Sequence, residues 1–184
     1  MSELAMRLSA KPTIWLLCAL AALVLSGCAT VQMNASPSPH PDREALWCVL
    51  QPINNTSTPY AGGRVQQQLG ALLGARGLRS VLLAPSFQGG GPLPIGANAK
   101  QQRQELAWAH RHAARYALLG SVDEWHYKIG LDGQPAVGFT LRLVDLRTGE
   151  TVWSGVASAS GSSREGLAVL STRTLAALLK RLLP

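Results

Sequence analysis

Two adjacent carboxylates, Asp123 and Glu124, are the side chains of this 184-residue sequence that most invite a catalytic interpretation. A glycan hydrolase needs two carboxyl groups about 5–10 Å apart around one bond. Neighbouring residues on a β-strand point to opposite faces of the sheet, so we do not expect this pair to act as acid and base. Asp145 and Glu150 flank a predicted hairpin turn, where acidic side chains commonly favour solvation and turn formation.

The histidines and serines offer no better arrangement for catalysis. His110 and His112 are two positions apart on a predicted helix and therefore diverge, which does not suit a shared metal ion. No serine lies in a Gly-x-Ser-x-Gly motif, and no Ser-His-Asp set can be assembled from the spacing. We therefore expect a protein that is not an enzyme and that has no metal and no cofactor.

Cys28 is the residue whose chemistry the surrounding sequence defines best. Arg7 and Lys11 supply positive charge ahead of an apolar run over residues 14–25, which is shorter than the roughly 20 residues of a membrane-spanning helix. The run ends in Leu25-Ser26-Gly27-Cys28, which matches the bacterial lipobox. In such signals the cysteine thiol is joined to diacylglycerol and the chain is cut before it. We expect a signal peptide over 1–27 and acyl chains, palmitate among them, on Cys28.

The residues that follow predict where the protein works. Ala29 stands where lipoproteins kept in the inner membrane usually carry aspartate, so we expect an outer-membrane anchor facing the periplasm. The formal net charge of +7 favours anionic lipid headgroups as a partner. It does not favour nucleic acid, because the sequence has no basic run, zinc spacing or ribonucleoprotein motif. Cys48 has no partner in the mature chain, and we expect it to pack in the core.

The mature chain divides into a linker and one domain. Residues 28–44 are polar and rich in proline, which predicts a lipidated N-terminus and flexible tether. At ~3.3 Å per residue such a tether reaches about 50 Å, which keeps the domain close to its membrane. Residues 45–184 are expected to form a single globular α/β domain.

Hydrophobic periodicity and turn residues predict the elements of this domain. The predicted strands are 45–50, 78–85, 116–130, 136–145 and 151–160, and the predicted helices are 64–76, 97–115 and a final one carrying leucines between 167 and 182. This order predicts an α+β fold, with a mixed β-sheet of about five strands. Three of the strands form a C-terminal meander, and three helices pack on the sheet.

The first hairpin of the meander has two possible registers. A three-residue loop over 132–134 pairs Trp125 with Leu141 and makes one face continuously apolar, whereas a two-residue turn places Trp125 opposite Thr140 and scatters the apolar groups. Register usually follows the pattern that buries one face, so we predict the first.

That register puts Asp123 opposite Leu143 at the end of the apolar face. Asp123 then lies where the sheet opens to solvent, caps a nearby turn, or is displayed to a ligand or lumen. Trp153 lies across from Leu143 if Gly149 forms a bulge, or across from Val144 if the turn is tight.

Several stretches of the chain resemble a known group of lipoproteins. "LLGSV" and "DLRTGETVWSG" are the most telling, and "LWCVLQPINNTST" and "RSVLLAP" add to them. These stretches are similar to periplasmic lipoproteins that share a core fold with the TolB N-terminal domain, the curli secretion lipoprotein CsgG and the synthase activator LpoB. Within the group, the size and lipobox are most similar to the PelC family of Pel exopolysaccharide export. CsgG-like pores carry inserted membrane hairpins, and LpoB-like activators have a long tether. This sequence has no alternating segments long enough for such hairpins, and its predicted tether is short.

The resemblance implies a homo-oligomeric ring on the outer membrane that guides a cationic exopolysaccharide to a PelB-like export porin. It implies that Asp123, with Glu124 beside it, faces the lumen, and that Trp153, with Trp125 and Arg142, lies at the membrane interface. Replacing Asp123 or Trp153 by alanine is then expected to reduce export and leave the fold intact. The alternative function is that of an LpoB-like activator of a peptidoglycan synthase.

Overall fold

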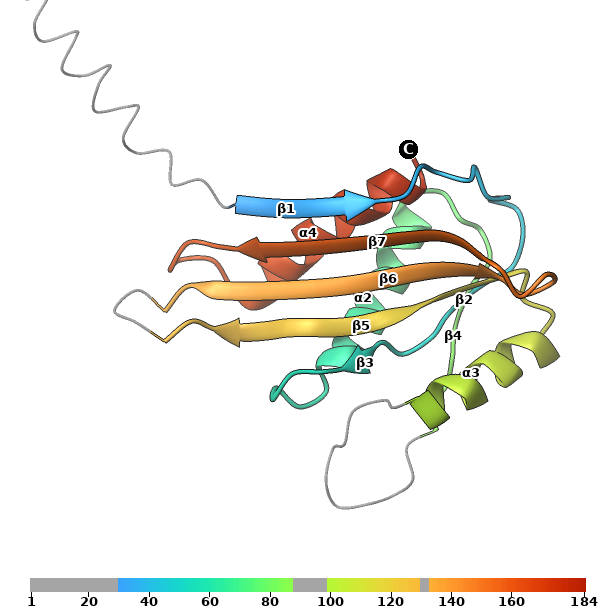
Figure 1. The fold of residues 1–184 in the computed structure, drawn as a ribbon, viewed down its shortest axis with the longest axis horizontal. Helices are drawn as coiled ribbons and strands as arrows, with labels where there is room; N and C mark the ends of the chain where they lie inside the picture. The colour runs from blue at the N-terminus through green and yellow to red at the C-terminus, as the bar shows by residue number, and fades with distance from the viewer. Residues whose placement is uncertain (1–29, 88–98, 130–132) are drawn as a thin grey trace, which may run out of the picture.

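One mixed β-sheet organises the computed structural model, which describes residues 30–87, 99–129 and 133–184 (Figure 1). The predicted signal peptide and Cys28 lie outside these residues. The strands are β1 (Thr30–Ala35), β2 (Trp47–Val49), β3 (Ile53–Asn54), β4 (Val81–Leu83), β5 (Tyr116–Tyr127), β6 (Pro135–Asp145) and β7 (Thr151–Ser160). Their order is β1-β7-β6-β5-β2-β4, with β3 also beside β5. β2, β3 and β4 run parallel to β5, whereas the neighbouring pairs β1–β7, β7–β6 and β6–β5 are antiparallel.

Three helices pack on this sheet: α2 (Ala61–Ala75), α3 (Ala99–Arg111) and α4 (Leu167–Leu182). The predicted α+β class, the meander and the three helices are confirmed. The sheet has seven strands and not about five, because β1 and β3 were not expected. Of the two partners considered for Trp153, the structure shows Leu143, and Gly149 has a positive φ of 77° in the turn before β7.

The segment predicted to be a flexible tether is largely part of the fold. β1 pairs with β7 along its whole length, from Thr30 opposite Ser160 to Ala35 opposite Gly155. Met33, on β1, packs against the core. The prediction of a flexible tether over 28–44 is therefore wrong for this strand.

The residues after β1 are also held to the domain. The Ser38 hydroxyl donates to the carbonyl oxygen of Leu182 at 2.7 Å, and the Arg43 guanidinium donates to that of Pro184 at 2.9 Å. The indole N–H of Trp47 donates to the Asp42 carbonyl at 3.0 Å. These hydrogen bonds tie the polar stretch to the last residues of the chain and to β2. Residues 30–44 therefore add almost nothing to the distance between the domain and its predicted anchor.

The two faces of the sheet are covered unequally. α2 and α4 bury one face, where Leu69 and Leu73 of α2 and Leu175 and Leu178 of α4 are fully buried. α3 covers the opposite face over β2 and the start of β5, in a smaller cluster that includes Cys48. Cys48 is completely buried as predicted, and burial raises the pKa of its thiol to about 12.

In the described chain, no helix covers the rest of the face on which α3 lies. We call the uncovered part, over β1, β7, β6 and the second half of β5, the outer face (Figure 1). By strand alternation and exposure it presents Gln32, Asn34, Asp123, Glu124, Thr140, Arg142, Ser154, Val156 and Ser158.

The register of the β5–β6 hairpin differs from both predicted registers. Trp125 lies opposite Val137 and Val122 lies opposite Phe139. The hairpin connection is wider than three residues, because the Lys128 amide donates to the Gln134 carbonyl at 2.8 Å. A register shift between Val122 and Glu124 then adds one residue to β5. Asp123 is therefore not opposite Leu143, although the inner face is still continuously apolar.

Candidate functional site

A β-bulge places Asp123 and Glu124 on the same face of the sheet. Val122 pairs with Phe139 and Glu124 with Gly138, so Asp123 is the extra residue of β5. In a bulge two residues oppose one, which interrupts the alternation of side chains. Val122 and Trp125 both point into the core, and Asp123 and Glu124 both lie on the outer face. The prediction that the two carboxylates point to opposite faces is wrong.

Three neutral side chains hold the Asp123 carboxylate. The Ser121 hydroxyl and the Asn55 amide donate to Oδ1 at 2.7 and 2.9 Å. The Thr140 hydroxyl donates to Oδ2 at 2.8 Å. The donors come from β5, from the segment after β3 and from β6, so three parts of the chain fix the orientation of one exposed carboxylate.

The negative charge of Asp123 is oriented but not neutralised. Among the described residues, no lysine, arginine or histidine lies within 4.0 Å of its oxygens. By contrast, Asp145 pairs with Arg115 through contacts of 3.0 and 2.7 Å, which lowers the pKa of that carboxyl. An exposed, fixed and unpaired carboxylate is suited to bind a passing cation or hydroxyl group.

Glu124 lies beside a shallow polar hollow on the same face. The hollow has a volume of about 260 Å³ and is lined by Gln32, Glu124, Lys128, Ser158, Ala159 and Ser160. His126 lies 3.6 Å from the Glu124 carboxylate, and Lys128 donates to the Ser160 hydroxyl at 2.7 Å. Such a mixture of amide, hydroxyl and charged groups can form hydrogen bonds with a polyhydroxylated chain.

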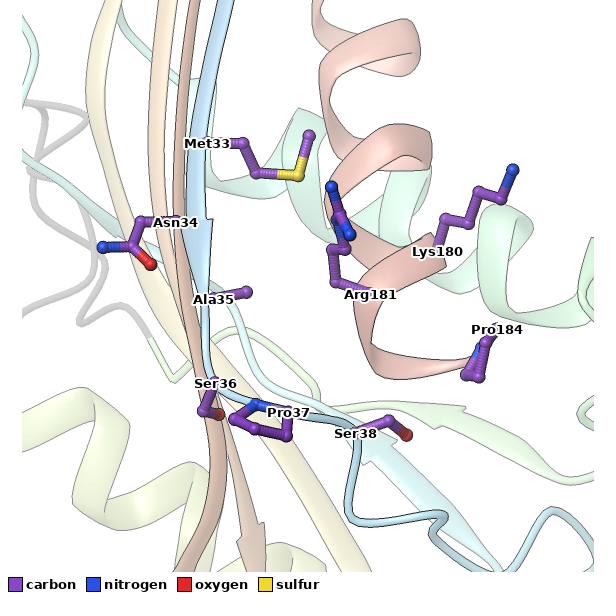
Figure 2. A pocket seen from close by; sticks show the side chains of 9 residues that line it. All are labelled: Met33, Asn34, Ala35, Ser36, Pro37, Ser38, Lys180, Arg181 and Pro184. Carbon is purple, nitrogen blue, oxygen red and sulfur yellow. The ribbon is translucent and has the colours of Figure 1, made fainter.

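A second hollow, of about 450 Å³, lies between the end of β1 and the last turn of α4 (Figure 2). Lys180 and Arg181 project from α4 beside it, and Met33, Ala35 and Ser38 line the opposite side. Its charged lining residues are all cationic, so this hollow does not suit a cationic ligand.

The two tryptophans predicted at a membrane interface lie in the core. Trp153 is 1% exposed and Trp125 is 3% exposed. Trp153 packs above Gly155 and close to Leu178, because a Cβ built on Gly155 would lie within 2.9 Å of both side chains. This burial contradicts a membrane-interface position for the two rings. Arg142 is exposed on the outer face, and its interface role stays a prediction.

Glu105 of α3 is a buried polar group that the sequence analysis missed. It is 0% exposed and accepts hydrogen bonds at 2.7 Å from the Gln51 amide and from the Gln101 side chain. Burial raises the pKa of its carboxyl, and the two hydrogen bonds partly oppose that effect. The arrangement fastens α3 to the segment after β2 and offers no access to a substrate.

The described residues contain no group of three or more His, Cys, Asp or Glu side chains that could hold a metal ion. His110 and His112 are both exposed on α3 and its C-terminal end. None of the helices described is long and apolar enough to cross a membrane.

Comparison with solved structures identifies close relatives of this fold. A PelC dodecamer from Paraburkholderia phytofirmans superposes with a TM-score of 0.71 and 34% identity, over 84% of this chain and 98% of that chain. A variant of the same dodecamer in another crystal form gives 0.70 and 33%, over 85% and 99%. A lipoprotein from Neisseria meningitidis, at 0.50 and 19% over 74% and 96%, shares the fold. No protein-family model and no curated protein matches the sequence.

Proposed function

The chain belongs to the PelC family of lipoproteins, and from this premise we propose that it is a noncatalytic, lipid-anchored component of exopolysaccharide export. The observation that carries the proposal is the likeness to PelC, which covers almost the whole of that protein at 34% identity.

The proposed working unit is a homo-oligomeric ring. The PelC of Paraburkholderia phytofirmans is a dodecamer, and a chain that shares its fold over nearly its full length can use the same surfaces. Cyclic symmetry repeats each surface group once per subunit around a common axis. One unpaired carboxylate per chain then becomes a closed band of negative charge that concentrates cations in the channel.

Asp123 is the proposed lumen-facing acid, with Glu124 beside it. Exposure, fixed orientation and the absence of a cation within 4.0 Å in the described chain support Asp123. Its ligand would be a cationic, Pel-like exopolysaccharide on its way to a PelB-like export porin. The fixed geometry favours transient contacts at the surface over enclosure of one sugar, because both carboxylates lie on an open face.

The proposed location is the periplasmic side of the outer membrane, where acyl chains on Cys28 hold the protein in the lipid. The alternative function, activation of a peptidoglycan synthase, needs a domain that reaches away from its anchor. The described structure gives it little support, because β1 and the hydrogen bonds of residues 38–43 incorporate the segment that would provide this reach.

Polymer export by cells that carry only a variant protein tests the role of Asp123. Asp123→Asn keeps the shape and removes the charge, so we expect several-fold less polymer outside the cell and accumulation in the periplasm. Glu150→Gln is the matched control, because Glu150 is an exposed carboxylate at the turn between β6 and β7. Equal export by the two variants would contradict the proposed site.

A further inference from the structure

The start of β1 is tied closely to the expected lipid anchor. Cys28 precedes Thr30 by two residues, so the Cα atoms of the two residues are at most ~7.6 Å apart. Thr30 lies opposite Ser160, at the end of β7. Acyl chains on Cys28 can enter a bilayer only if this end of the sheet lies near the bilayer surface.

The other long strands and α4 reach the same end of the sheet. Ser160 also pairs with Ala136 at the start of β6, and Tyr127 at the end of β5 pairs with Pro135. The Leu167 amide, at the start of α4, donates to the Tyr127 hydroxyl at 3.3 Å. Figure 1 shows that β1 and β6 begin, and β5 and β7 end, at this same end of the sheet.

Exposed apolar side chains gather at this end of the sheet. The described chain has six exposed large hydrophobic side chains, and four of them lie here: Val31 (36%), Tyr127 (51%), Ile129 (106%) and Val169 (61%). We call these four, together with Lys128 and Arg164, the anchor end. Ile129 has no cover from the described chain, although its full exposure to water is unfavourable.

The charges of the anchor end are those that anionic headgroups attract. Lys128 and Arg164 are exposed. Glu165 lies next to Arg164 in the segment between β7 and α4, and Arg173 neutralises its charge through a contact of 3.1 Å. Tyr127 has an apolar ring and a polar hydroxyl, and it lies next to Ile129 and the two cations. Side chains of these kinds are typical of proteins at the headgroup level of bilayers.

We propose that the anchor end is a second membrane contact, in which Tyr127 and Ile129 enter the headgroup region of the leaflet that holds the acyl chains. Lys128 and Arg164 then lie against anionic phospholipid headgroups. The proposal rests on the lipidation of Cys28 that is part of the proposed function. It sets the strands end-on to the bilayer, with Asp123 about 13 Å along β5 from Tyr127.

A nitroxide label on the lipidated full protein tests this orientation. Cys48 is fully buried and Cys28 carries lipid, so Ile129→Cys supplies one reactive thiol. Val156→Cys is the matched control, because Val156 is equally apolar, 51% exposed and in the middle of β7. The protein is reconstituted into vesicles of phosphatidylethanolamine and phosphatidylglycerol, and label collisions with oxygen and with a water-soluble nickel complex are measured.

The expected result is a several-fold higher oxygen-to-nickel collision ratio at position 129 than at position 156. A water-like ratio at both positions, in protein that floats with the vesicles, overturns the docking and leaves the anchor intact. A high ratio at both positions overturns the end-on orientation. Protein that does not float with the vesicles overturns the lipidation and the docking together.

Discussion

Removal of the Trp153 ring separates a core position from a membrane-interface position. The side chain is 1% exposed and packs above Gly155 and beside Leu178. Replacing a fully buried aromatic side chain by alanine costs about 3–5 kcal/mol, from lost transfer free energy and from the cavity that remains. We therefore expect Trp153→Ala to lower the free energy of unfolding by about 3–5 kcal/mol. Any loss of export would then follow from loss of fold, contrary to the sequence-based expectation of an intact fold.

Urea unfolding followed by circular dichroism measures this effect through the midpoint and the slope. Trp153→Phe should cost less than half as much, because the indole N–H has no hydrogen-bond partner in the described structure and phenylalanine fills most of the space. Val156 lies on the same strand but is 51% exposed, so Val156→Ala should keep the free energy of unfolding within about 0.5 kcal/mol of the wild type. A Trp153→Ala protein as stable as the wild type would refute the core assignment and restore the membrane-interface one.

Three further predictions concern the buried carboxylate, a close strand contact and an uncrowded helix position. Glu105→Gln should gain stability relative to the wild type as pH rises from about 4.5 to 7, measured by urea midpoints across that range. The sign follows from the raised pKa: the folded protein holds the Glu105 proton more tightly than the unfolded chain, so the wild type loses that contribution as pH rises. Gly120→Ala should destabilise by roughly 3 kcal/mol, because its Cβ would lie 1.9 Å from the Thr140 carbonyl oxygen. Gly63→Ala, whose Cβ on α2 meets nothing within 4 Å, should instead stabilise by up to about 1 kcal/mol in the same thermal or urea assay.

The local patterns of the sequence predicted most of the fold. The leucines of the last helix, the turn glycine Gly149 and the apolar strand around Cys48 each signal their element through neighbouring residues. β1 was missed because its partner is far away in sequence. Ser36, just after β1, and Ser154 of β7 are 118 residues apart, and the polar composition of β1 gave no strong local signal.

The bulge at Asp123 could have been predicted from the spacing of two apolar residues, had strict alternation of side chains along the strand not been assumed. Val122 and Trp125 are both large and apolar, and they are three positions apart. A regular strand cannot point both into the core, so an extra residue between them was required. Recognising this would have placed Asp123 and Glu124 on one face, whereas the partner of Trp125 is set by the longer hairpin connection.

The orientation of Trp153 could not be read from its own neighbourhood. β7 alternates Trp153, Gly155, Ala157 and Ala159 on its inner face. These small residues make room for α4, and the ring covers Gly155. A single tryptophan among small residues fits an exposed aromatic position equally well, and only the packing of α4 decides between them.

The mass of the lipidated protein in mild detergent tests the central claim most directly. Native mass spectrometry, or light scattering during size-exclusion chromatography, counts the chains in the assembly. Membership of the PelC family and the proposed ring predict one closed species with many copies of the chain and a fixed stoichiometry across concentrations. A protein that remains a monomer at high concentration would contradict the ring, and with it the proposal that Asp123 of each copy lines a common channel.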